Sequence, residues 1–329
     1  MELQYYNPFR HLEFQQNICF LTGKKLETDE QHTVAAFPEW LVERYHLQDA
    51  SIAMLGGNRM KYKDMLLPAS QETAAAIKHL DSITQTAFEH GYDAVIQLPE
   101  HTIFQWMARV LYGVLYQDLV YAIRQHQAKG KNFQISDVLQ LRLKNLHLML
   151  QSLVTPIEFN GFVPWSMKCY SVNISKDILN YKDETQDLNF CLGMNGFGII
   201  ACLQDNGAVA QFNHDVLEKI GAATLHPAQF EELYGRFVYS NYLLRKNSSY
   251  MLTESNGKLI FNLPEDVQNT PPQFATWQDE VFAQVLANLW RPWGITLEKI
   301  HQFPNLPISY LIDERTYQFI EAEKVDLPF

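Results

Sequence analysis

The sequence predicts an α+β protein, in which helices and strands occupy separate stretches of the chain instead of alternating regularly. Two hairpin signals, Asn195-Gly196 and Asn256-Gly257, lie between apolar runs, and tight primed turns require the positive φ that Asn and Gly adopt readily. Residues 69–154 instead carry apolar side chains at the helical spacings of three and four. Segregated helices and strands are typical of the α+β class and not of a doubly wound parallel sheet.

The first predicted zone, residues 1–68, consists mainly of short extended segments. An extended stretch over 13–21 leads into a turn at 22–25, and strands are expected over 31–36 and 60–67, with a turn at 56–58. A helix is expected to begin at Pro38 and to pass through Tyr45, because proline suits the first helical turn, where its missing N–H costs nothing.

The second zone, residues 69–154, is expected to be helical throughout. Ser70 is a suitable N-cap for a helix that ends near Gly91, and a longer helix is expected over 99–127. A third helix is expected to begin at Ser136-Asp137 and to place leucines on its inner face up to Leu153. This zone therefore forms a central helical section.

The third zone, residues 155–329, is predicted to combine an antiparallel sheet with helices. Short strands are expected over 168–174, 188–194, 197–203, 208–212, 251–253 and 258–261, and helices over 227–245 and 276–290. The helix at 227–245 is interpreted as amphipathic, with Phe230, Leu233 and Phe237 in the core, although its aromatic residues also permit a stacking surface for bases. We therefore predict two regions, 1–154 and 155–329.

The composition of the 329-residue chain limits its partners. Its formal net charge of -11 disfavours phosphate backbones and anionic lipid surfaces, so neither a nucleic acid nor a membrane is the expected partner. The four cysteines do not form pairs with metal-ligand spacing and are expected to be free thiols of a reducing compartment. The N-terminus lacks the pattern of a secretory signal, which indicates a cytoplasmic location.

One part of the chain, about residues 13–120, resembles a family of cysteine-rich HNH-type endonuclease-like proteins. The run Cys-Phe-Leu-Thr-Gly at 19–23 is followed by Glu-Gln-His at 30–32 and by Phe-Pro-Glu-Trp-Leu at 37–41. The family has a CxxCG knuckle, a Glu-His dipeptide and a Pro-x-Trp-Leu helix start in this order. Its second CxxC-Asn element falls here on 69–73, its later apolar-acidic pair on Leu80-Asp81, and its Trp-containing helix near Trp106.

This resemblance implies a catalytic role for His32, because the family's histidine activates water for attack on a phosphodiester beside a divalent metal ion. It also implies a zinc knuckle, but the four cysteine positions hold Cys19, Thr22, Ala69 and Glu72. Of these residues, only Cys19 and Glu72 have side chains of the types that bind zinc, and a closed zinc site needs four ligands. The asparagine position holds Thr73, and Gln31 separates Glu30 from His32.

We interpret the N-terminal zone as a degenerate HNH-like ββα scaffold, with Cys19 and Glu72 as vestigial metal ligands and a hydrophobic core in place of the knuckle. The predicted function is a non-catalytic interaction or structural role with a protein partner and no cofactor. The alternative is a divergent nuclease that uses His32 and a divalent metal ion to cleave a nucleic acid. A third hypothesis is small-molecule binding in a cleft between the helical section and the C-terminal region, which the aromatic content permits.

Overall fold

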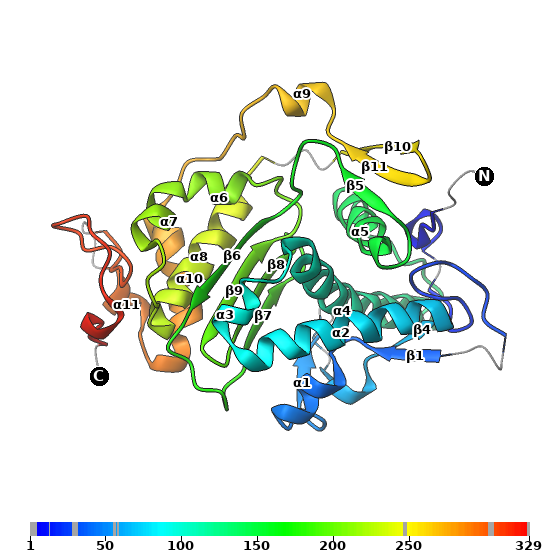
Figure 1. Cartoon of the computed structure of the whole chain (residues 1–329), viewed down its shortest axis with the longest axis horizontal. Helices are drawn as coiled ribbons and strands as arrows, with labels where there is room; N and C mark the ends of the chain where they lie inside the picture. The colour runs from blue at the N-terminus through cyan, green and yellow to red at the C-terminus, as the bar shows by residue number, and fades with distance from the viewer. Residues whose placement is uncertain are drawn as a thin grey trace. The chain divides into compact units, whose positions relative to one another are not determined.

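The computed structural model describes residues 5–12, 14–27, 32–54, 57, 59–245, 249–301 and 306–327 (Figure 1). The chain forms two compact units that are assembled from interleaved segments. Unit 1 is drawn from residues 1–87, 98–162 and 248–269, and unit 2 from residues 88–97, 163–247 and 270–329. Both units combine helices with β-sheet, which confirms the predicted α+β class. No helix within the described ranges is both long and apolar enough to cross a lipid bilayer.

Unit 1 combines three small sheets with long helices. Its helices are α1 (Glu39–Arg44), α2 (Gln71–His90, of which the last three residues belong to unit 2), α4 (Glu100–Ala128), α5 (Asp137–Leu150) and α9 (Glu265–Gln268). Its strands are β1 (His32–Ala35), β2 (Ser51–Ala53), β3 (Arg59–Lys61), β4 (Leu66–Ala69), β5 (Ile157–Phe159), β10 (Met251–Ser255) and β11 (Lys258–Asn262).

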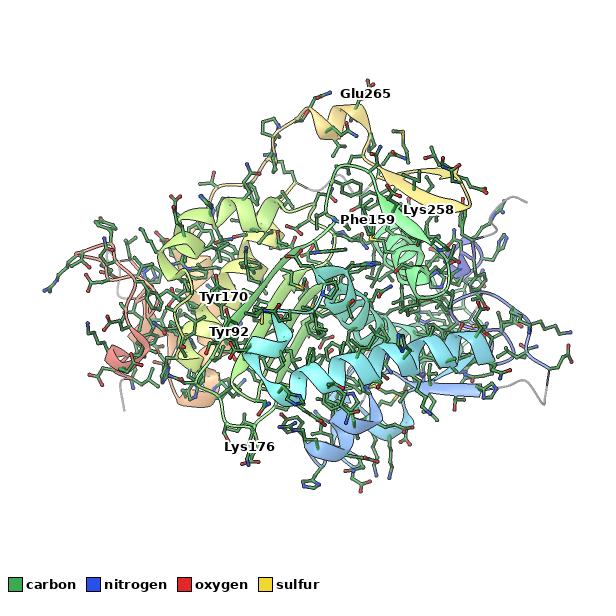
Figure 2. All side chains as sticks on the ribbon, in the orientation of Figure 1. Tyr92, Phe159, Tyr170, Lys176, Lys258 and Glu265 are labelled. Atoms are coloured by element: carbon green, nitrogen blue, oxygen red, sulfur yellow. The ribbon has the colours of Figure 1, made fainter. Side chains whose placement is uncertain are left out.

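The sheets of unit 1 are short and mostly antiparallel. Strand β1 pairs with β4, with His32 opposite Ala69, and β2 pairs with β3. Strands β10 and β11 form the hairpin predicted at 256–257, and β5 pairs with β11 in parallel. Figure 2 labels Phe159 on β5 and Lys258 on the neighbouring β11.

The predicted helical section is confirmed, and its caps follow from the sequence. Ser70 Oγ accepts a hydrogen bond from Thr73 N–H at the start of α2, and Ser136 Oγ accepts one from Leu139 N–H at the start of α5. Helix α4 is buried over most of its length. Gly113 permits this helix to approach the segment after β1, because a Cβ there would lie 2.6 Å from the Cβ of Ala36.

Unit 2 is built on one antiparallel sheet with strand order β6-β9-β8-β7. Its strands are β6 (Ser166–Ser171), β7 (Asn180–Glu184), β8 (Asn189–Met194) and β9 (Phe197–Cys202). Its helices are α3 (Tyr92–Val95), α6 (Ala208–Phe212), α7 (His214–Ile220), α8 (Pro227–Leu243), α10 (Asp279–Trp290) and α11 (Leu297–Ile300).

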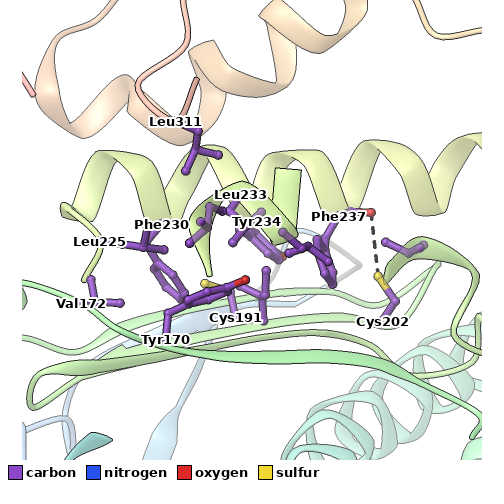
Figure 3. Packing of buried hydrophobic residues seen from close by; sticks show 14 residues of the cluster. Tyr170, Val172, Cys191, Cys202, Leu225, Phe230, Leu233, Tyr234, Phe237 and Leu311 are labelled. Carbon is purple, nitrogen blue, oxygen red and sulfur yellow. Dashed lines mark hydrogen bonds between the residues drawn. The ribbon is translucent and has the colours of Figure 1, made fainter. Parts of the chain in front are cut away.

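The core of unit 2 lies between the sheet and α8 (Figure 3). Figure 3 shows Phe230, Leu233, Tyr234 and Phe237 of α8 directed toward strand residues such as Cys191. A Cβ on Gly198 of β9 would lie 2.4 Å from the Phe230 ring, so the helix and the strand are in close contact. The amphipathic interpretation of 227–245 is therefore confirmed.

Several local predictions need correction. Residues 208–212 form α6 and not a strand, because Asp205 Oδ2 accepts a hydrogen bond from Val209 N–H and Gly207 adopts a left-handed φ of 79°, which together start a helix. The strand predicted over 60–67 is interrupted by a 3₁₀ turn at Tyr62–Asp64. The expected extended stretch over 13–21 is mostly turns, with one bridge from Ile18 to Lys25. Residues 13, 30, 31, 56 and 58 lie outside the described ranges.

Candidate functional site

The segment that resembles the first half of a zinc knuckle, residues 18–25, forms a tight loop. Cys19 N–H donates to Lys24 O at 2.8 Å, and Gly23 N–H donates to Cys19 O at 3.0 Å. Phe20 N–H donates to Pro68 O at 2.8 Å, which fixes the loop against β4. These bonds place the Cys19 thiol beside the start of α2.

The thiol of Cys19 is completely buried and belongs to a small hydrogen-bonded cluster. Its Sγ lies 3.2 Å from Thr73 Oγ1, and Ser70 Oγ donates to the same Thr73 oxygen at 3.1 Å. Burial raises the pKa of Cys19, but hydrogen bonds from Thr22, Thr73 and the Ser70 backbone together lower it below its ordinary value. The loop and the helix start are thus joined by hydroxyl groups.

The donor set in this cluster does not fit a zinc ion. Of the four positions that the resemblance assigns to zinc ligands, Ala69 has no ligand atom in its side chain, Thr22 supplies only a hydroxyl, and Glu72 is exposed on the first turn of α2. The polar contacts of Cys19 are with Thr22, Thr73 and Ser70 and not with Glu72. In the described part of the chain, no three His, Cys, Asp or Glu side chains are grouped around a common point suitable for a metal.

His32, the predicted catalytic residue, is the first residue of β1 and is exposed. It lies opposite Ala69, so the register places it close to the start of α2. Its sequence neighbours Glu30 and Gln31 lie outside the described residues. The structure therefore brings His32, Cys19 and Thr73 into one region of unit 1, but with His32 at the surface and the other two side chains inside.

The same region contains a cavity of about 650 Å³ between β1, α1 and α2, and Arg109 of α4 also lines it. Trp40 and Ile77 are the largest apolar side chains that line it. The remaining lining residues are Thr33, Val34, Ala35, Glu39, Glu43, Ala74, Lys78, Asp81, Ser82, Gln85 and Arg109. Figure 1 shows β1 running alongside α2, with α1 next to them.

An ion pair between Asp81 and Arg109 lines this cavity. Arg109 Nη2 lies 2.9 Å from Asp81 Oδ2, and the guanidinium also donates to Ala35 O at 2.9 Å and to Ala36 O at 3.1 Å. The Arg109 side chain is only 3% exposed, against 18% for Asp81. Burial raises the pKa of Asp81 to about 6, although the Arg109 charge acts to lower it, and Glu39 adds to the increase.

This ion pair is not completely satisfied by hydrogen bonds. Asp81 Oδ1 and Arg109 Nε are both buried, and neither has a hydrogen-bond partner among the described residues. Buried polar atoms usually have partners, and leaving one unpaired costs about 1–3 kcal/mol. Both residues line the cavity, but these two atoms have almost no exposed surface themselves. The lining offers hydrogen bonds and charge, but it contains no serine–histidine or cysteine–histidine pair for nucleophilic catalysis.

The sequence draws attention to Asp81 only through the resemblance, and it assigns Arg109 no role at the site. The signal for Arg109 is in the sequence, because it is the only charged residue between Ile103 and Tyr116, a run with helical apolar spacing. A charge inside a buried helix requires a partner. The identity of that partner depends on tertiary packing, since Asp81 lies 28 residues away in the chain.

Comparisons of the chain with protein-family models, with curated proteins and with solved structures give no match.

Proposed function

We propose that this chain is a non-catalytic interaction protein, built on a degenerate HNH-like scaffold in its N-terminal zone. Its binding surface is the cavity between β1, α1 and α2. The observation that carries this proposal is the ion pair of Asp81 and Arg109, which lies in the wall of a cavity whose lining contains no serine–histidine or cysteine–histidine pair. Such a cavity, with apolar walls and a few polar groups, is suited to holding a ligand.

The cluster around Cys19 supports the non-catalytic part of the proposal. In the resemblance, this is where zinc would hold the knuckle to the helix. Here Thr73 Oγ1 contacts the thiol, and the Ser70 hydroxyl donates to Thr73 Oγ1. The scaffold is thus held by hydrogen bonds and packing. A protein partner is the expected ligand, because the net charge of -11 opposes a nucleic acid.

A cleavage assay distinguishes this function from the alternative, a nuclease that uses His32. The full chain is incubated with supercoiled plasmid DNA and Mg²⁺ or Mn²⁺, beside the His32→Ala variant. We expect no difference between the two proteins. Cleavage by the wild-type chain that the substitution abolishes would overturn the proposal.

Metal analysis of the purified chain provides a second, independent test. We expect substoichiometric zinc and no effect of a chelator on the thermal unfolding midpoint. Stoichiometric zinc that is lost in the Cys19→Ser variant would show that the cluster is a metal site and would contradict the proposed scaffold.

A further inference from the structure

We propose that the cavity binds an extended peptide that pairs with the open edge of β1 and places a lysine or arginine side chain against Asp81. This inference rests on the proposed function and names the ligand class of the same site. It follows from three observations: the hydrogen-bond directions of β1, the charges around the cavity, and the partly exposed side chain of Asp81 in the cavity lining.

The hydrogen-bond directions follow from the register of β1 with β4. Pro68, which lies opposite Thr33, directs its carbonyl to Phe20 N–H and therefore away from β1. Leu66, opposite Ala35, likewise directs its carbonyl to Gln117 Nε2. In an antiparallel ladder, two opposite residues either bond to each other or both point outward. The main-chain groups of Thr33 and Ala35 thus point away from β4.

The outward edge of β1 faces the cavity, because Thr33, Val34 and Ala35 all line it. Ala35 O is occupied by Arg109, but Thr33 N–H, Thr33 O and Ala35 N–H have no partner among the described residues. An exposed strand edge is a template for another strand. Addition of an extended peptide to such an edge is a known mode of recognition, in which main-chain bonds give affinity and pockets give specificity.

The charges around the cavity favour a basic side chain on that peptide. Three carboxylates, from Glu39, Glu43 and Asp81, face two cations, Lys78 and Arg109, and Arg109 is already paired with Asp81. Lysine and arginine side chains combine a donor head with an apolar stem. The stem would contact Trp40 and Ile77 while the head pairs with the carboxylate of Asp81, whose side chain lines the cavity and is 18% exposed.

A peptide library tests the inference on the full chain. Peptides of about seven residues, long enough to extend beyond a four-residue strand such as β1, carry Lys, Arg, Gln or Glu at the centre and degenerate residues elsewhere. We expect enrichment of the Lys and Arg pools, with β-forming residues next to the centre. Equal recovery from the Glu pool, or no enrichment in any pool, would overturn the inference.

Affinity measurements with the enriched peptides then test the two contacts separately. Asp81→Asn is expected to weaken binding about tenfold or more, as for loss of a charge-assisted hydrogen bond. Asp49→Asn is the matched control, since Asp49 is an exposed carboxylate of unit 1 outside the cavity lining, and it should leave the affinity unchanged. Equal effects of the two substitutions would contradict the assigned contact.

Thr33→Pro tests the strand edge without removing a bond to β4, because the N–H that it deletes points outward and proline is tolerated at a strand edge. We expect loss of peptide binding with an unchanged circular dichroism spectrum and unfolding midpoint. Retained binding in this folded variant would exclude pairing with β1. Failure of the peptide experiments without DNA cleavage would defeat this inference alone, whereas His32-dependent cleavage would defeat the proposed function.

Discussion

Each unit contains an aspartate that is largely removed from solvent, and the two differ in how completely their oxygens are hydrogen-bonded. Asp205 of unit 2 accepts hydrogen bonds from Ser166 N–H at 2.7 Å, from Ser166 Oγ at 2.5 Å and from Val209 N–H at 2.8 Å. Asp81 of unit 1 uses one oxygen for Arg109 and leaves Oδ1 without a partner in the described structure. Burial raises the pKa of both carboxyl groups.

Asp205 has a structural role, whereas Asp81 is the carboxylate that we expect a ligand to contact. The bonds of Asp205 connect the start of β6 to the start of α6, so the carboxylate holds two elements in place. Asp81 instead lies in the wall of a cavity of about 650 Å³, and its side chain is 18% exposed. A fully bonded buried group mainly determines stability, and a partly bonded group beside a cavity is available to a ligand.

The largest expected effect is the loss of stability when the fully hydrogen-bonded carboxylate of Asp205 is removed. Asp205→Ala should lower the free energy of unfolding by about 4 kcal/mol, because it leaves several buried donors without an acceptor. Denaturant unfolding measures this change, with Asp215→Ala, an exposed residue in the first turn of α7, as the control. A loss below about 1 kcal/mol would contradict the structural role of Asp205.

The next effect concerns the ion pair of the cavity. Arg109→Leu should destabilise the chain by about 3 kcal/mol, since it leaves Asp81 as a largely buried carboxylate without a cation. Addition of Asp81→Asn should recover part of this loss, because the neutral amide is less costly to bury. Additive losses in the double variant, by denaturant unfolding, would show that the two side chains are not coupled.

A third effect is a pH dependence of the free energy of unfolding that arises from His147 of unit 1. Both ring nitrogens of this side chain have hydrogen-bond partners. Its Nε2 lies 2.8 Å from Phe20 O, and its Nδ1 lies 3.2 Å from Gln151 Nε2. Burial lowers the pKa of His147 to about 4, below the ordinary value of 6.5. As the pH falls, His147 therefore binds a proton in the unfolded chain before it does so in the folded chain. The stability that this group contributes is present above pH 6.5 and is lost as the pH falls toward 4.

Between pH 7 and pH 5, wild-type protein should lose on the order of 2 kcal/mol more stability than the His147→Gln variant. Unfolding curves at the two pH values measure the difference. The matched variant cancels the contribution of Asp81, whose raised pKa acts with the opposite sign. Parallel losses in both proteins would mean that His147 is not buried as a neutral ring.

The smallest effect is expected at the hydrogen-bonded cluster of Cys19, Ser70 and Thr73. Cys19→Ala should cost about 1 kcal/mol, the loss of one buried hydrogen bond with little change in volume. Denaturant unfolding with and without a chelator measures it. Complete unfolding of this variant, or a cost that appears only without chelator, would indicate that Cys19 binds a metal ion.

Much of the fold could be predicted from the sequence, because local signals are strong in the helical section and at the turns. Ser70 and Ser136 cap their helices as predicted, and Asn195-Gly196 turns with φ of 46° and 80°. The start of α6 was missed, since the Asp205 and Gly207 that begin the helix lie just before an apolar run that equally suits a strand.

The candidate site was predicted only in part. The resemblance drew attention to Cys19, Thr73 and Asp81, and the hydrogen bond between Cys19 and Thr73 joins two of these residues across 54 positions. The pairing of Asp81 with Arg109 could not be predicted, because it depends on how α2 and α4 pack against β1. The open edge of β1 likewise follows only from its register with β4.

Residue-resolved amide hydrogen exchange tests the central claim most directly. On addition of an enriched lysine-centred peptide at a concentration near its wild-type Kd, the amides of Thr33 and Ala35 should exchange more slowly in the wild-type chain and should be protected much less in Asp81→Asn. Protection confined to residues outside β1, α1 and α2, or equal protection in both proteins, would contradict the account.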